Sequence, residues 1–161
     1  GTTFMVFLPT SVAETSRANL DRAEAFGSRT EESLRGSETI LLVDDESVVR
    51  CMMRDTLELF GYKVIEAARG TEALQALSRY DRQIHLLLTD LSMPEMDGFE
   101  LTTHVRSLRP SIRTLIVTGC SDESTQLEQV LANGVPVLAK PFSTDDLMHW
   151  VREILDGTFT Y

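Results

Sequence analysis

The stretch Leu86-Leu87-Leu88-Thr89-Asp90 and the turn after it, Leu91-Ser92-Met93-Pro94-Glu95-Met96-Asp97-Gly98, organise this sequence. An apolar run of this length is consistent with a buried parallel strand, and it ends in one carboxylate. Because a turn that contains Pro and Gly follows directly, we expect Asp90 at the carboxyl end of that strand. In open α/β sheets, ligands bind at that edge. The stretch therefore predicts a carboxylate at the ligand-binding edge of a parallel sheet.

Three other apolar runs also end in polar or charged residues. Residues 39–43 run into Asp44 and Asp45, residues 114–118 end at Thr118, and residues 135–139 run into Lys140. Each of these side chains has a structural explanation when it is taken alone, and Asp90 by itself could simply cap a turn. Four expected strands that all end in groups of complementary chemistry indicate a shared site instead.

Apolar strands and amphipathic helical patterns alternate from Glu38 onward. We expect strands over residues 39–43, 62–67, 84–89, 114–118 and 135–139, each followed by a helix. Thr71 is a candidate cap for the second of these helices. Five strands alternating with five helices predict an α/β fold with a doubly wound parallel sheet, although periodicity does not determine the strand order. No glycine-rich loop of the Walker or dinucleotide type occurs, which disfavours a nucleotide-binding fold.

Composition restricts the functional classes. The 161 residues are enough for one ordinary domain plus a tail, and they carry a net charge of -10 with 15 Lys and Arg and no basic cluster. Direct binding of nucleic acid is therefore not expected. No apolar run approaches the roughly 20 residues of a membrane helix, so we expect no membrane contact by this segment. Cys51 and Cys120 are too few for a disulfide framework, and a reduced, cytoplasmic setting fits best.

The acidic residues indicate a particular chemistry if they converge. Asp44, Asp45 and Asp90 would repel one another, and one of them would have a raised pKa unless a cation intervened. Mg²⁺ is a hard cation that accepts carboxylates and waters as ligands. A carboxylate beside such a metal suits phosphoryl transfer, because carboxylates are known nucleophiles that form aspartyl-phosphates. Lys140 would supply a second cation, and the Thr118 hydroxyl could donate to a phosphoryl oxygen.

These motifs together resemble the receiver domain of two-component response regulators. The resemblance covers about residues 38–157 and rests on Asp44-Asp45, Asp90, Met93-Pro94, Asp97-Gly98, Thr118-Gly119 and Lys140-Pro141-Phe142. It implies a flavodoxin-like sheet of five strands in the order 2-1-3-4-5, with five helices. It also implies that the domain takes a phosphoryl group from the phosphohistidine of a histidine kinase or phosphotransfer protein. A receiver catalyses its own phosphorylation and dephosphorylation, and we expect a monomer.

The resemblance assigns roles to individual residues. Asp90 would accept the phosphoryl group, and Thr118 and Lys140 would contact it. Asp45 and Asp90 would bind Mg²⁺ directly together with the Ser92 carbonyl, whereas Asp44 would act mainly through water.

Val137 departs from the family pattern. The family usually carries Tyr or Phe three residues before the lysine, at the position of Val137. In receivers, phosphorylation is thought to draw the hydroxyl at the Thr118 position inward, and the aromatic ring follows it. Valine is stiff and short, so we predict a relay or sink for phosphate with a muted conformational output.

The start of the sequence resembles a different domain. Residues 1–9, Gly-Thr-Thr-Phe-Met-Val-Phe-Leu-Pro, resemble the last strand of the ATP-binding domain of histidine kinases. Residues 10–37 are poor in large apolar side chains, so we interpret them as a linker that adds no strand or helix face to the core. Residues 158–161 form a C-terminal tail. This arrangement predicts the C-terminal receiver of a hybrid histidine kinase, whose catalytic core and any membrane anchor lie in other segments.

Two alternatives belong to other functional classes. A stand-alone or degenerate receiver would act as a protein-interaction module, but no acidic, Thr or Lys position of the site is missing. An enzyme of the haloacid-dehalogenase type also uses an Asp nucleophile and Mg²⁺. That enzyme would need a second Asp two residues after Asp90, where this sequence has Ser92.

Overall fold

The computed structural model of this chain describes residues 30–119 and 125–158. The kinase-like residues 1–9, the first twenty residues of the expected linker, and most of the C-terminal tail lie outside the described residues.

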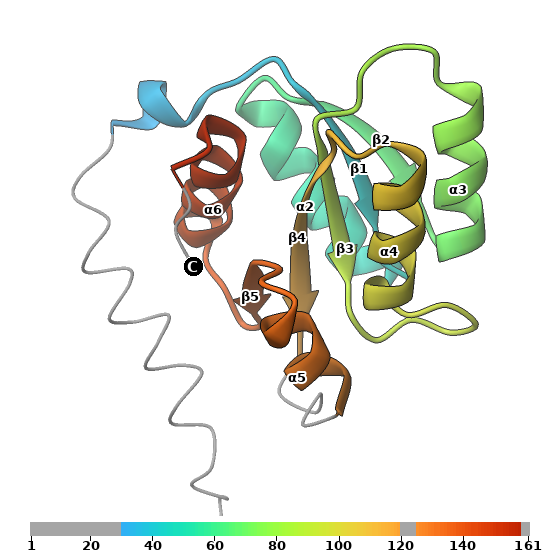
Figure 1. The fold of residues 1–161 in the computed structure, drawn as a ribbon. Coiled ribbons are helices and arrows are strands. Elements are labelled where there is room, and N and C mark those ends of the chain that lie inside the picture. The colour runs from blue at the N-terminus through green and yellow to red at the C-terminus, as the bar shows by residue number, and fades with distance from the viewer. Residues whose placement is uncertain (1–29, 120–124, 159–161) are drawn as a thin grey trace, which may run out of the picture.

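Five parallel strands form the single sheet of the described residues (Figure 1). The strands are β1 (Thr39–Val43), β2 (Lys63–Ala67), β3 (Leu86–Asp90), β4 (Arg113–Thr118) and β5 (Val137–Ala139), and their order is β2-β1-β3-β4-β5. The predicted doubly wound sheet and its strand order are therefore confirmed. Strand β5 is shorter than expected, because its pairing with β4 begins at Val137 and the preceding proline has no N–H to donate.

Within the described residues, five helices cover the two faces of the sheet. They are α2 (Ser47–Leu59), α3 (Gly70–Arg79), α4 (Gly98–Leu108), α5 (Thr125–Ala132) and α6 (Thr144–Asp156). Buried side chains of α2 and α6 share one apolar cluster with one face of the sheet, and those of α3 and α4 share a second cluster with the other face. Figure 1 shows α3 and α4 together on one side and α6 on the other. Every side chain of β1 and β3 is buried, which explains the apolar runs of residues 40–43 and 86–88.

The expectation that Thr71 caps a helix is wrong. Helix α3 begins one residue earlier, at Gly70, so Thr71 lies inside the first turn and is exposed. The N-cap position is Arg69, which makes no capping hydrogen bond through its side chain. The carboxylate of Glu72 instead accepts a hydrogen bond from the Ala68 backbone N–H at 2.9 Å. An acidic side chain in the first turn therefore satisfies the backbone before this helix.

The end of the expected linker contacts the domain. Residues Glu31–Leu34 form a short 3₁₀-helix, η2, which packs next to α6. The Leu34 side chain is 3% exposed and joins the apolar cluster of α2 and α6. We interpreted residues 10–37 as a linker that adds no strand or helix face to the core, but the Leu34 side chain of this stretch is part of the core.

Candidate phosphoacceptor site

Three of the predicted site residues meet at the carboxyl edge of the sheet. Asp44 follows β1, Asp90 ends β3, and Lys140 follows β5. The Lys140 ammonium nitrogen lies 2.5 Å from Asp90 Oδ1 and 3.3 Å from Asp44 Oδ2. Strands β1 and β3 are neighbours in the sheet, so their carboxylates lie close together although 46 residues separate them in the sequence. One lysine therefore pairs with two buried carboxylates.

Asp90 is held in place from both sides of its carboxylate. Its Oδ1 atom accepts from Lys140, and its Oδ2 atom accepts a hydrogen bond from the Ser92 backbone N–H at 2.8 Å. Burial raises the pKa of Asp90 above the ordinary aspartate value, and the Asp44 charge adds to this effect, whereas Lys140 and the Ser92 N–H oppose it. The residue is 6% exposed, so it is largely withdrawn from bulk water.

Asp44 and Asp45 differ in environment although they are adjacent. Asp44 is fully buried, and its Oδ1 atom accepts a hydrogen bond from the Glu46 backbone N–H at 2.8 Å. The Asp44 carbonyl oxygen accepts from the Arg50 guanidinium at 2.5 Å. Asp45 is exposed to solvent. The pair thus offers one carboxylate fixed inside the site and one that is open to a ligand.

A backbone hydrogen bond and two charged partners hold Lys140 in position. Its backbone N–H donates to the Thr118 carbonyl at 2.7 Å, which extends the pairing of β5 with β4. Burial lowers the pKa of the ammonium, but the hydrogen bonds and charges of Asp90 and Asp44 prevail and raise it above the usual lysine value. Lys140 therefore remains a cation at neutral pH. The peptide bond that follows it, to Pro141, is cis.

The two expected switch residues lie on neighbouring strands. Thr118 ends β4 at the same edge as Asp90, and its side chain is buried, with the hydroxyl 3.5 Å from the Gly119 carbonyl. Val137 begins β5 opposite Ile116 and is partly buried. It packs against the apolar cluster that includes Leu91 and Val130. Val137 thus contributes to the core between the sheet and α5.

The loop after β3 is held by contacts that we did not predict from the sequence. Asp97 caps α4 by accepting a hydrogen bond from the Glu100 backbone N–H at 2.7 Å, and its Oδ2 atom accepts from the Gln126 side chain of α5 at 3.0 Å. A Cβ atom at Gly98 would overlap the carbonyl oxygen of Asp90, so the start of α4 packs directly on the site. The Asp-Gly pair before an apolar-periodic segment is a helix-start signal that could have revealed the cap. The contact with α5 has no signal in the sequence.

The donor atoms of the site fit a magnesium ion in chemical type. Carboxylate oxygens and a backbone carbonyl are the ligands that Mg²⁺ prefers, and each carboxylate oxygen has lone pairs beyond one hydrogen bond. Among the described residues, however, no three His, Cys, Asp or Glu side chains are already arranged to hold a metal. In this arrangement the Lys140 ammonium supplies the positive charge between Asp44 and Asp90.

Comparisons with known proteins agree with this fold. The sequence matches the response regulator receiver domain family over residues 40–152. The sensor kinase CckA of Brucella abortus (strain 2308) is 35% identical over 158 residues, which cover 97% of this chain and 17% of that kinase. A CheY-like receiver domain protein from Methanospirillum hungatei JF-1 has a TM-score of 0.68 and 30% identity over 76% of this chain and 96% of its own. The receiver domain from the hybrid histidine kinase CckA has a TM-score of 0.61 and 31% identity, and covers 73% of this chain and 98% of its own.

These matches define a phosphoacceptor domain of two-component signalling. The chain belongs to the response regulator receiver domain family. Receiver domains interact with histidine kinases or phosphotransfer proteins, and they generally use Mg²⁺ for phosphorylation. The chain spans 17% of the CckA kinase, so the activity of such a whole kinase does not follow from the match. None of the helices in residues 30–119 and 125–158 has the length and apolar character needed to span a membrane.

Proposed function

We propose that Asp90 accepts a phosphoryl group from a phosphohistidine donor and that Lys140, Thr118 and the neighbouring acidic residues assist this transfer. The observation that carries the proposal is the pairing of the buried Asp90 carboxylate with the Lys140 ammonium at 2.5 Å. A carboxylate nucleophile must be ionised, and this cation favours the ionised form against the effect of burial.

The transfer replaces one phosphorus bond by another. An Asp90 carboxylate oxygen forms a bond to phosphorus as the P–N bond of the phosphohistidine breaks, and the electron pair of that bond stays on the imidazole nitrogen. Negative charge on the phosphoryl oxygens must then be neutralised. The Lys140 ammonium, which already reaches Asp90, would donate to one of these oxygens. The Thr118 hydroxyl, at the end of the adjacent strand, would donate to another. The same residues would serve when water removes the phosphoryl group.

A magnesium ion would be held by residues of this same edge. Asp45 and Asp90 would bind it directly with the Ser92 carbonyl, and Asp44 would contact it through water. When bound, the ion supplies positive charge that neutralises the phosphoryl oxygens during transfer. The exposed position of Asp45 supports its role as the residue that recruits the ion from solvent.

The parent protein is proposed to be a hybrid histidine kinase in the cytoplasm, and this chain its C-terminal part. We divide the chain into a kinase end (residues 1–9), a linker (10–37) whose described residues contact the receiver, a monomeric receiver (38–157) and a tail (158–161). The match to the CckA sensor kinase supports this proposal because it covers 97% of the chain and so extends beyond the receiver residues.

Intact-mass analysis after incubation with acetyl phosphate and Mg²⁺ tests the assignment of Asp90. The wild-type chain should gain one phosphoryl group that is stable in acid and labile in base. Asp90→Asn should gain none, because the amide has the same shape but is not nucleophilic. Asp81→Asn, which changes an exposed carboxylate away from the site, is the matched control and should behave as wild type. A full yield of adduct on Asp90→Asn would assign the nucleophile elsewhere, and no adduct on the wild type would favour a degenerate receiver.

A further inference from the structure

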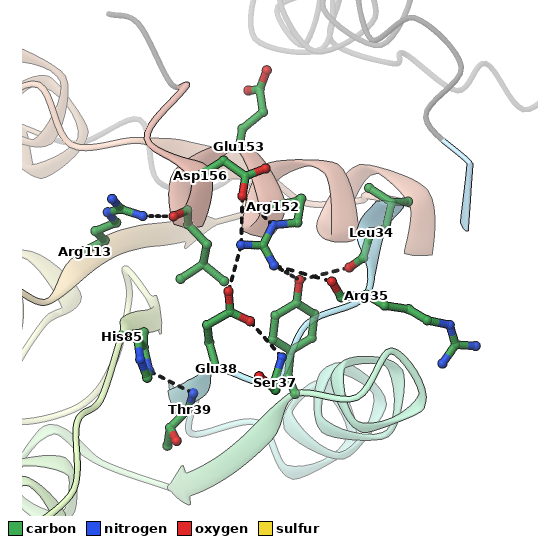
Figure 2. A network of polar contacts seen from close by, with 12 residues as sticks. Leu34, Arg35, Ser37, Glu38, Thr39, His85, Arg113, Arg152, Glu153 and Asp156 are labelled. Atoms are coloured by element: carbon green, nitrogen blue, oxygen red, sulfur yellow. Dashed lines mark hydrogen bonds and ion pairs between the residues drawn. The ribbon is translucent and has the colours of Figure 1, made fainter. Parts of the chain in front are cut away.

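A network of polar contacts joins the segment that enters the domain to its last helix. Figure 2 shows the Arg152 guanidinium of α6 pointing toward the carboxylates of Glu38 and Asp156. It donates to Glu38 Oε1 at 2.8 Å, to the Tyr62 hydroxyl oxygen at 3.1 Å and to Asp156 Oδ1 at 2.9 Å. The Tyr62 hydroxyl in turn donates to the Leu34 carbonyl at 2.9 Å. We call the docked segment, residues 30–38, together with Tyr62 and Arg152, the entry latch.

The buried charge in the entry latch is that of Arg152, and the partly exposed carboxylates of Glu38 and Asp156 balance it. Arg152 is 8% exposed, and arginine is almost never this buried without partners. Burial alone would raise the pKa of Glu38, but the hydrogen bond from Arg152 and those from backbone N–H groups hold it below its usual value. Both groups are therefore ionised at neutral pH. Removal of Arg152 would leave the partly buried Glu38 carboxylate without its cation, which is unfavourable.

Apolar packing and backbone hydrogen bonds hold the same segment. Leu34 enters the cluster formed by α2, α6 and the sheet. The Gly36 N–H donates to the Phe60 carbonyl at 3.1 Å, and the Arg35 side chain donates to the Leu59 carbonyl at 3.2 Å. A Cβ atom at Gly36 would overlap the Tyr62 ring, so the backbone lies directly on that ring. The segment is thus fitted to a surface made by the end of α2, the start of β2 and the end of α6.

The entry latch lies at the opposite edge of the sheet from Asp90. Glu38 precedes β1 and Tyr62 precedes β2, so both belong to the amino edge of these parallel strands. Arg152 lies near the end of α6, whereas the start of α6 follows shortly after Lys140. Figure 1 shows η2 beside the end of α6 and away from the carboxyl ends of the strands. Helix α6 therefore spans the distance between the phosphoacceptor edge and the entering chain.

We propose that the entry latch mechanically couples the chain that precedes the receiver to helix α6. Residues 30–38 then form a fixed extension of the domain. A movement of the preceding chain that pulls these residues away breaks their contacts with the end of α6. Conversely, a shift of α6 releases the segment. The entry latch needs no phosphoryl transfer at Asp90, so this proposal can be tested separately from the proposed function.

The first test compares stability in the full chain. Leu34→Ala removes a buried side chain and should lower the melting temperature by about 8 °C. Leu59→Ala, in the same region but 69% exposed, is the matched control and should change it by about 1 °C or less. Arg152→Met should lower the melting temperature by a similar amount, whereas Arg54→Met, which breaks only surface ion pairs, should have little effect. Equal small shifts for Leu34→Ala and Leu59→Ala would show that the segment is not docked.

The second test separates coupling from a general loss of stability. Amide hydrogen exchange should show faster exchange at Gly36 in Arg152→Met, and faster exchange in the last turn of α6 in Leu34→Ala. Leu77→Ala, in the core on the opposite face of the sheet, provides a variant of comparable global destabilisation. In that variant the last turn of α6 should be less affected than in Leu34→Ala. The same exchange in α6 for both variants, or unchanged exchange at Gly36 in Arg152→Met, would overturn the proposal.

Discussion

Replacement of Lys140 by methionine tests whether the ammonium charge stabilises the buried carboxylates of the site. Methionine keeps most of the apolar stem but removes the ammonium that pairs with Asp90 and Asp44. Removing one partner of a buried ion pair costs about 3–5 kcal/mol. The Lys140 side chain is 25% exposed, so water compensates part of the loss, and we expect about 2 kcal/mol. For a domain of this size, that loss lowers the melting temperature by about 8 °C.

The loss of stability should depend on pH in a bell-shaped manner. Without Lys140 the pKa of Asp90 rises further, and an acid whose folded pKa exceeds its unfolded value destabilises the fold as pH rises through that range. The deficit of Lys140→Met should therefore shrink when acid protonates Asp90. In the wild type, the raised pKa of Lys140 means that its contribution is complete below the ordinary value of 10.5 and is lost above it. The deficit should thus be largest between these two ranges.

Urea denaturation of both proteins across this pH range measures the effect. Lys63→Met is the control, because Lys63 is the other lysine of the chain and is exposed. Millimolar Mg²⁺ should stabilise Lys140→Met more than the wild type, since the ion supplies the missing positive charge. A deficit below about 0.5 kcal/mol, or one that does not vary with pH, would refute the claim that Lys140 neutralises two buried carboxylates.

Three further predictions concern the metal, the loop after β3 and the switch position. Asp45→Ala should remove most of the rise in melting temperature caused by millimolar Mg²⁺, and Asp44→Ala should remove less of it. Equal rises in the wild type and in both variants would exclude an acidic metal site. Gly98→Ala should lower the free energy of unfolding by about 3 kcal/mol in urea denaturation, because its Cβ overlaps the Asp90 carbonyl, and a neutral result would mean that α4 shifts freely. With a beryllofluoride mimic of the phosphoryl group, changes in amide NMR shifts should be confined to residues near the site, because the Val137 side chain is short and stiff. Extensive changes through α5 and α6, or dimerisation, would contradict that expectation.

The fold could be predicted from the sequence because its strands are buried on both faces. Short apolar runs such as residues 40–43 and 86–88 indicate interior strands, and the helices between them show one apolar face each. Element ends were less certain. Thr71 resembled a helix cap by type, but the cap position depends on where the chain turns toward the sheet, and α3 starts before it.

The candidate site residues could also be selected from the sequence. Each of them follows or ends an expected strand: Asp44, Asp90, Thr118 and Lys140. Strand order, known beforehand only through the resemblance to receivers, decides which of them meet. Adjacent strands β1 and β3 bring the two buried aspartates together, and Lys140 reaches both from β5.

Only the tertiary structure decided the role of the segment before the domain. Its composition indicates a linker, because a stretch with so few large apolar residues cannot form a core by itself. One leucine and one glutamate are nevertheless enough to dock it, since the folded domain already supplies the complementary surface of Tyr62 and Arg152. Local sequence determines which elements form. The contribution of a single side chain such as Leu34 depends on an apolar cluster to which Tyr62, α2 and α6 contribute, and only the folded structure brings these parts of the chain together.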